Sequence, residues 1–80
     1  MPLLSPEQCR AARGLLDWTQ EELAERANVS RSTIRDFENG RHCLHSVTAA
    51  QVVAAFECGG ALLIPSGKAG PGVRLRKPTG

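Results

Sequence analysis

The sequence predicts a compact, mainly α domain of four or five helices, followed by a C-terminal extension of two β-strands. Helix start signals precede apolar residues at helical spacing in the first three quarters of the chain, and the pattern after Gly60 changes to short or alternating apolar runs. The length of 80 residues, with 41% hydrophobic and 22% charged residues, is typical of one globular domain. We expect a helical domain over 1–60, strands within 61–77 and a frayed end at 78–80.

The first helix is predicted from a capping box at the start of the chain. Ser5 is the expected cap, Pro6 occupies the first helical position, and Gln8 follows three residues after the serine. Gly14 costs about 1 kcal/mol of helix propensity relative to alanine, and marks either a close helix contact or a weakened helix end. The expected buried stripe consists of Cys9, Ala12, Leu15 and Leu16.

A second capping box, Thr19 with Glu22, predicts a helix that runs to about Ala27. Asn28 follows it, and asparagine is the non-glycine residue that best tolerates the left-handed conformation of a tight turn. The sequence therefore indicates a short turn between this helix and the next.

Two more helices and two strands complete the prediction. Ser30 caps a third helix, from Arg31 to about Glu38, which stops at Asn39-Gly40. Ser46 is the expected cap of a fourth helix that ends at Gly59-Gly60. Its apolar face consists of Ala49, Val52, Ala55 and Phe56.

The strands are expected at Ala61–Ile64 and Val73–Arg76, with turn-rich residues between them. In the second strand, Val73 and Leu75 alternate with arginines, as in a strand with one buried face. An isolated two-stranded hairpin is marginal in water. These strands must therefore pack on the helices or pair with a second copy of the chain.

The net charge of +2 arises after Glu57, where every charged residue is basic: Lys68, Arg74, Arg76 and Lys77. Many soluble domains have a basic tail, so it indicates nucleic acid only together with a motif. The three cysteines are an odd count without a CxxC pair, which favours free thiols.

Several function classes are disfavoured. His42, Cys43 and His45 resemble metal ligands, but a zinc site needs four ligands and no second pair is present, so we expect no metal and no cofactor. No acid is placed to orient either histidine, and no phosphate loop or paired carboxylate occurs, so we expect no enzyme. No apolar run approaches the roughly 20 residues that span a bilayer, and no signal peptide begins the chain, so we expect a cytoplasmic protein without membrane contact.

The segment from Gln20 to Gly40 carries the functional signal. Two short helices joined by a tight turn lock together only where small and apolar residues meet, and Asn28 supplies the turn. The inward positions are held by Leu23, Ala24, Ala27, Val29, Ile34 and Phe37. The pattern predicts a helix-turn-helix over about 20–39, whose second helix is presented to the DNA major groove.

The run TQEELA…VSRSTIRDFENG resembles the phage repressor and Cro class of helix-turn-helix proteins, the XRE family. The similarity covers roughly residues 5–58, and Asn28 replaces the usual turn glycine without steric conflict. The resemblance implies a repressor-like DNA-binding domain over 1–60. It also implies a sequence-specific transcriptional regulator that binds double-stranded operator DNA as a homodimer.

The resemblance also assigns roles to individual residues. The candidates for base edges in the recognition helix are Arg31, Ser32, Arg35 and Asp36. The candidates for phosphate contacts are Gln20, Thr33, Asn39 and Arg41, with His42 or His45 as additions. Arg13 and Glu38 match a structural pair that bridges the first and third helices. Asp36 has an equal alternative as a salt-bridge partner of Arg31 or Arg35, and Trp18 is expected in packing rather than in base stacking.

Two questions stay open at the level of sequence. The strands are the first candidate for the dimer contact, and the outer face of the fourth helix, with Val53, is the second. The alternative function is a protein-interaction module, an antitoxin or antiactivator that uses the same fold. RNA polymerase or a regulatory protein is a further candidate partner.

Overall fold

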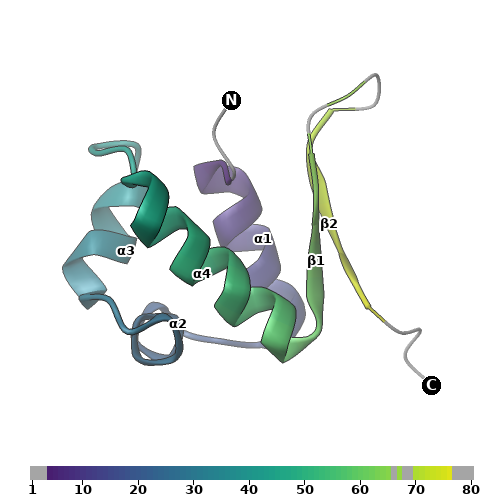
Figure 1. The fold of residues 1–80 in the computed structure, drawn as a ribbon, viewed down its shortest axis with the longest axis horizontal. Coiled ribbons are helices and arrows are strands. Elements are labelled where there is room, and N and C mark those ends of the chain that lie inside the picture. The colour runs from purple at the N-terminus through teal and green to yellow at the C-terminus, as the bar shows by residue number, and fades with distance from the viewer. Residues whose placement is uncertain (1–3, 66, 68–69, 77–80) are drawn as a thin grey trace.

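The computed structural model describes residues 4–65, 67 and 70–76 (Figure 1). The predicted mainly α fold with a two-strand extension is confirmed, with four helices and one antiparallel sheet in the described part of the chain. The expected frayed end at 78–80 and the basic residues Lys68 and Lys77 lie outside the described residues. The elements are α1 (Pro6–Leu16), α2 (Gln20–Ala27), α3 (Arg31–Glu38), α4 (Ser46–Gly59), β1 (Ala61–Ile64) and β2 (Gly72–Leu75).

Local capping sets the starts of the first two helices as predicted. The Ser5 hydroxyl accepts from the Gln8 backbone N–H at 3.1 Å, and the Ser5 N–H donates to the Gln8 side chain. Thr19 and Glu22 form the equivalent reciprocal pair at the start of α2. Each box satisfies two of the backbone groups that a helix end leaves without a partner.

Three local predictions are wrong. His45, rather than Ser46, is the cap of α4, because Ala49 N–H donates to the His45 carbonyl at 2.8 Å and starts the helix one residue earlier. Leu15 is 42% exposed, because α1 turns the Cys9 and Ala12 stripe inward and leaves Leu15 beside it. The second strand covers Gly72–Leu75 rather than Val73–Arg76, because Gly60, the residue hydrogen-bonded to Arg76, has the left-handed conformation that ends α4 and so does not extend β1.

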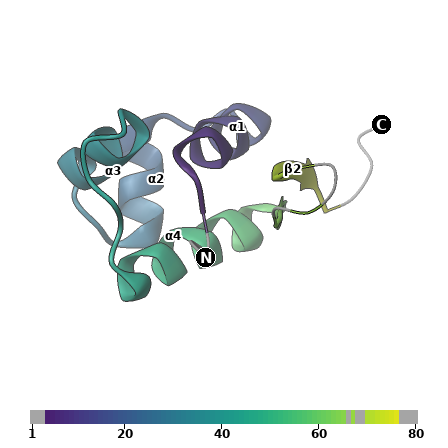
Figure 2. The ribbon, with the colours of Figure 1, turned by 90° about the horizontal axis from the view of Figure 1, so that it is seen from above.

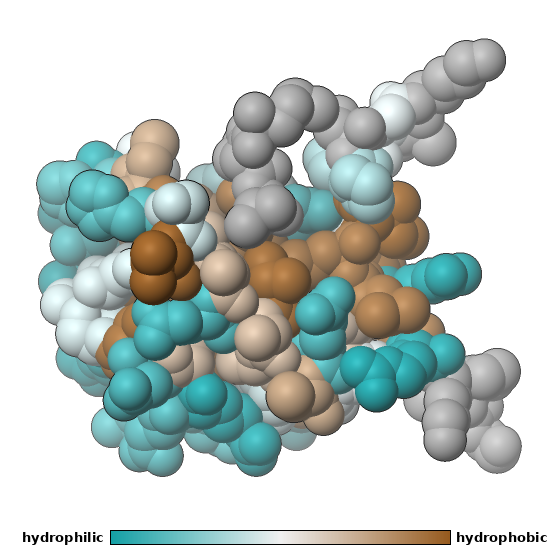
Figure 3. Space-filling model, in the orientation of Figure 1, coloured by the Kyte–Doolittle hydropathy of each residue, from teal (hydrophilic) through white to brown (hydrophobic). Residues whose placement is uncertain are grey.

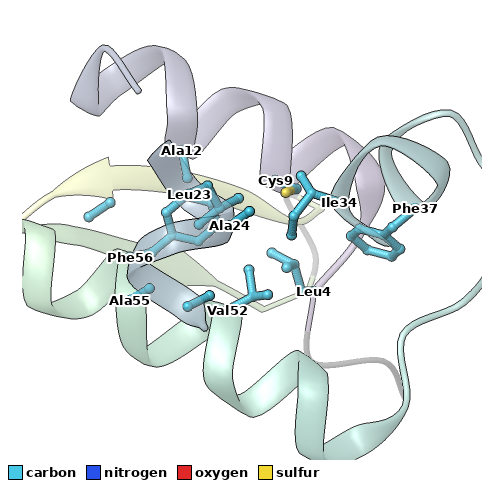
Figure 4. Close-up of a cluster of buried hydrophobic side chains, with 12 residues drawn as sticks. Leu4, Cys9, Ala12, Leu23, Ala24, Ile34, Phe37, Val52, Ala55 and Phe56 are labelled. Carbon is cyan, nitrogen blue, oxygen red and sulfur yellow. The ribbon is translucent and has the colours of Figure 1, made fainter. Parts of the chain in front are cut away.

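The helices enclose one apolar core. In Figures 1 and 2, α1 and α4 lie on opposite sides of the core, α3 lies at one end, and the hairpin lies at the other end. Figure 4 shows the core side chains converging from all four helices. Its largest fully buried members are Phe56, Leu23, Ile34, Val52 and Cys9.

Trp18 closes the core at the junction of α1 and α2, as the sequence predicts. Its ring stacks on Phe56, with centroids 5.9 Å apart, and the Arg26 guanidinium lies 4.5 Å from the indole centroid. A Cβ at Gly59 would lie 2.6 Å from two Trp18 ring carbons, so the ring rests directly on the backbone of α4. Through these contacts, the Trp18 side chain packs against the core, as expected.

The hairpin packs on the helices through one face. Opposite residues pair as Ala61 with Leu75 and Leu63 with Val73, and Leu63 and Val73 contact the core. The buried Gln8 side chain donates to the carbonyls of Ile64, at 2.8 Å, and Gly72, at 3.0 Å. One amide on α1 therefore anchors both strands. Across the described residues, no helix combines the length and the hydropathy needed to cross a membrane.

Candidate nucleic-acid interface

The segment α2–turn–α3 has the geometry that the sequence predicts. Asn28 adopts the left-handed conformation, with φ 59° and ψ 45°, and ends α2. The next residue, Val29, donates its N–H to the Ala24 carbonyl at 3.0 Å, and Ser30 caps α3 by accepting from the Thr33 N–H at 3.2 Å. The predicted inward positions are buried, apart from the half-buried Val29, and they are Leu23, Ala24, Ala27, Ile34 and Phe37.

The face of α3 that turns away from this core carries the candidates for base contact. Arg31, Ser32 and Arg35 are exposed, whereas Asp36 is half-buried. The Arg35 Nε lies 3.4 Å from the Asp36 carboxylate, and the two side chains are 49% and 24% exposed. Figure 3 shows that the end of the molecule that carries α3 is largely hydrophilic. Asp36 therefore has its alternative partner, Arg35, within reach in the free protein.

The candidates for phosphate contact lie on both sides of α3. Gln20 is half-buried at the N-terminus of α2, and Asn39 and Arg41 are exposed in the segment after α3. The backbone N–H groups of Asn39, Gly40 and Arg41 all donate to carbonyls of α3. Asn39 and Arg41 can therefore donate to a ligand through their side chains, since their backbone N–H groups are already hydrogen-bonded. The Thr33 hydroxyl lies 2.7 Å from the hydroxyl of Ser30, the N-cap of α3, so the Thr33 side chain is hydrogen-bonded within the cap.

The Glu38 carboxylate connects three helices at the end of α3. Arg13 Nε and NH2 donate to its two oxygens at 2.7 Å each, Gln20 Nε2 donates to Oε1 at 3.0 Å, and the carboxylate is almost fully buried. Burial alone would raise the pKa of Glu38, but the hydrogen bonds from Arg13, Gln20 and Cys9 lower that pKa below its ordinary value. Glu38 is therefore an ionised anchor that holds Gln20 against α3.

A helix-turn-helix family model matches residues 10–63, well over half of the chain. The chain belongs to the Cro/C1-type helix-turn-helix family, also called the XRE family. A search of the curated proteins finds no match for the chain. Membership in the XRE family implies DNA binding, and families of this DNA-binding type are typically regulators rather than enzymes.

Sequence reasoning missed three contacts that this XRE domain makes through α1. Cys9 donates its thiol to Glu38, Arg10 donates to the Glu38 carbonyl, and Gln8 holds the hairpin. The helical spacing places Cys9 and Arg13 on one face of α1, which was the available signal. The partners of Gln8, Cys9 and Arg10 lie 28 to 64 residues away along the chain, so helical spacing alone did not identify them.

His42, Cys43 and His45 are exposed on the segment between α3 and α4. Within the residues that the structure describes, no group of three or more His, Cys, Asp or Glu is placed to hold a metal ion. The two histidines lie close in sequence to Arg41.

Proposed function

We propose that this chain is a sequence-specific transcriptional regulator that places α3 in the major groove of double-stranded DNA. The observation that carries the proposal is the outward face of α3, where Arg31, Ser32 and Arg35 are exposed on a helix whose other face is locked in the core. An arginine in the major groove donates two hydrogen bonds to guanine O6 and N7. Ser32 lies between the two arginines in the sequence of α3, and its hydroxyl can donate or accept one further hydrogen bond.

In this proposal, Asp36 acts through Arg35. The distance of 3.4 Å between Arg35 Nε and Asp36 Oδ1 allows the carboxylate to hold the guanidinium toward one base pair. It also reduces the repulsion that a lone carboxylate would meet beside phosphates. Acceptance from a cytosine amino group is the alternative role of Asp36.

Contacts to phosphate would fix the register of α3 on the duplex. Gln20 stands at the positive N-terminal end of α2, and Asn39 and Arg41 follow α3, so the set flanks the recognition helix on two sides. Thr33, in the first turn of α3, completes the set. These contacts raise affinity without selecting sequence.

The proposed regulator acts as a homodimer on an operator whose half-sites are about one helical turn apart. The hairpin is the preferred contact, because β1 and β2 pair only with each other in the described residues, which leaves each with an open edge. Ile64, on the outer face of β1, is 40% exposed. The second candidate is the outer face of α4, where Val47 is 72% exposed; Val53, which was expected on that face, is half-buried and packs against the core instead.

A salt titration with a duplex of mixed sequence tests the DNA-binding part of the proposal. The logarithm of the binding constant should fall steeply and linearly with the logarithm of the salt concentration. The Arg41→Ala variant should reduce that slope by about 1, because one phosphate contact is lost.

Arg26→Ala is the matched control, because it removes another exposed arginine, which lies over the Trp18 ring and belongs neither to the candidate DNA contacts nor to the candidate dimer surfaces. It should leave the slope nearly unchanged. A shallow slope in the wild-type chain, or equal losses in the two variants, would favour the protein-interaction module instead.

A further inference from the structure

The Cys9 thiol is a buried polar group that the proposed DNA contacts do not explain. The side chain is fully buried, and Figure 4 shows it pointing from α1 into the core on the side of Ile34. Its Sγ lies 3.0 Å from Glu38 Oε2. Burial, the hydrogen bond to Glu38 and the charge of Glu38 all raise the pKa of the thiol, so the group stays protonated and donates. A thiol of this kind is a poor nucleophile, which argues against a redox role.

The hydrogen bonds to Glu38 divide between its two oxygens. Oε2 accepts from Cys9 and from Arg13 Nε, and Oε1 accepts from Arg13 NH2 and from Gln20 Nε2. Arg13 alone fixes the carboxylate in the plane of its guanidinium. The thiol adds a second donor to Oε2, from another side chain of α1. A rotation of the carboxylate that turned Oε1 away from Gln20 would therefore also break the two hydrogen bonds that Oε2 accepts, from Cys9 and from Arg13.

We propose that Cys9 is a positioning residue for DNA binding, which holds the Glu38 carboxylate so that Gln20 presents its side-chain amide to a phosphate. One Nε2 hydrogen of Gln20 is bound to Glu38, and the second is then directed by that bond. The inference rests on the proposed phosphate contact of Gln20. If it is correct, Cys9 influences the affinity for DNA although it lies in the core and does not contact DNA.

Two substitutions at Cys9 separate the loss of the hydrogen-bond donor from a change in core packing. Cys9→Val keeps a similar volume but removes the donor, and Cys9→Ser keeps a donor. We expect Cys9→Val to weaken binding of a mixed-sequence duplex about threefold to tenfold, and Cys9→Ser to retain most of the affinity. Cys9→Ala replaces the valine variant if valine prevents folding, since it removes the same donor with a smaller side chain.

A double-mutant cycle with Gln20→Ala tests the route of the effect. If Cys9 acts through Gln20, Cys9→Val should change affinity little in the Gln20→Ala background. Val52→Ala is the control for general loss of core packing, because Val52 is equally buried but lies on α4. Its effect on affinity should follow only the folded fraction and should be the same in both backgrounds.

A measurement without DNA separates this inference from the proposed function. In the NMR spectrum of the free protein, the side-chain amide signals of Gln20 should shift in Cys9→Val and stay near the wild-type positions in Cys9→Ser. Unchanged Gln20 signals in Cys9→Val would overturn the positioning role. So would an affinity loss that is independent of Gln20. Failure of the wild-type chain to bind any duplex would instead overturn the proposed function, while the NMR signals would still decide whether Cys9 positions Gln20.

Discussion

Glu38 gives the fold a predictable response to acid. Its pKa is held below the ordinary value by hydrogen bonds that outweigh the effect of burial. A group with a lowered folded pKa stabilises the fold above its unfolded pKa, about 4.3 for glutamate, and this contribution is lost as the pH falls through the folded value. The free energy of unfolding should therefore decline below about pH 5, and decline less in Glu38→Gln.

The same variant should lower stability at neutral pH by about 1–3 kcal/mol, because the Arg13 guanidinium loses its charged partner. Urea unfolding at several pH values measures both effects. Glu25→Gln, which removes an exposed carboxylate from α2, should keep the wild-type pH dependence. If the free energy of unfolding depended on pH in the same way in wild type and Glu38→Gln, Glu38 would not be the group responsible for the loss of stability in acid.

Two helical glycines should respond in opposite directions to the same substitution. A Cβ at Gly14 meets no atom within 4 Å, so Gly14→Ala should stabilise the protein by about 0.5–1 kcal/mol through helix propensity. A Cβ at Gly59 meets Trp18 at 2.6 Å, so Gly59→Ala should cost about 1–3 kcal/mol and change the tryptophan fluorescence. Thermal unfolding of the two variants checks the signs, and a stabilised Gly59→Ala would refute the close contact.

At the scale of elements, the predictions succeeded where the determining contacts are local. The starts of α1, α2 and α3 follow from side chains that bond within three residues, at Ser5, Thr19 and Ser30. The start of α4 lacks a side-chain cap bond, and β2 ends at Leu75 because Gly60, the partner of Arg76, belongs to the cap of α4 rather than to β1. Neither boundary is set by a hydrogen bond from a neighbouring side chain, so the predicted start of α4 and end of β2 are each wrong by one position.

The proposed base contact of Arg31 in α3 can be tested by substitution. Arg31→Ala should weaken binding to a selected DNA site by about 1–3 kcal/mol and relax the preference for one base pair. The same variant should weaken binding to mixed sequence much less, because a base contact contributes little there. Binding isotherms with both duplexes measure the difference, and equal losses on the two would exclude base contact by Arg31.

At the scale of the whole molecule, the sequence predicted the elements of the site but not how they are joined. The pairing of Arg13 with Glu38 was expected from the family resemblance. Gln8 and Cys9 were interpreted only as a cap and as core, because their partners belong to the hairpin and to the end of α3. The two neighbouring residues thus connect α1 to both ends of the molecule.

The proposed homodimer is tested by adding one charge to each candidate surface. Ile64→Lys changes the outer face of the hairpin, and Ala54→Lys changes the exposed face of α4. If the hairpin forms the contact, sedimentation equilibrium should show a monomer for Ile64→Lys and a dimer for Ala54→Lys. The reverse result would assign the contact to α4, and a monomeric wild-type chain would remove the hairpin from this role.

The most direct test of sequence-specific DNA binding is selection of bound sequences from a random duplex library by the wild-type protein near physiological salt. A dimer that inserts α3 into the major groove should enrich one site with two-fold symmetry, whose half-sites are about one helical turn apart. The Arg31→Ala variant should lose preference at one position in each half-site. If the folded protein enriches no sequence, it does not bind DNA sequence-specifically, and its helix-turn-helix is better explained as a surface for another protein.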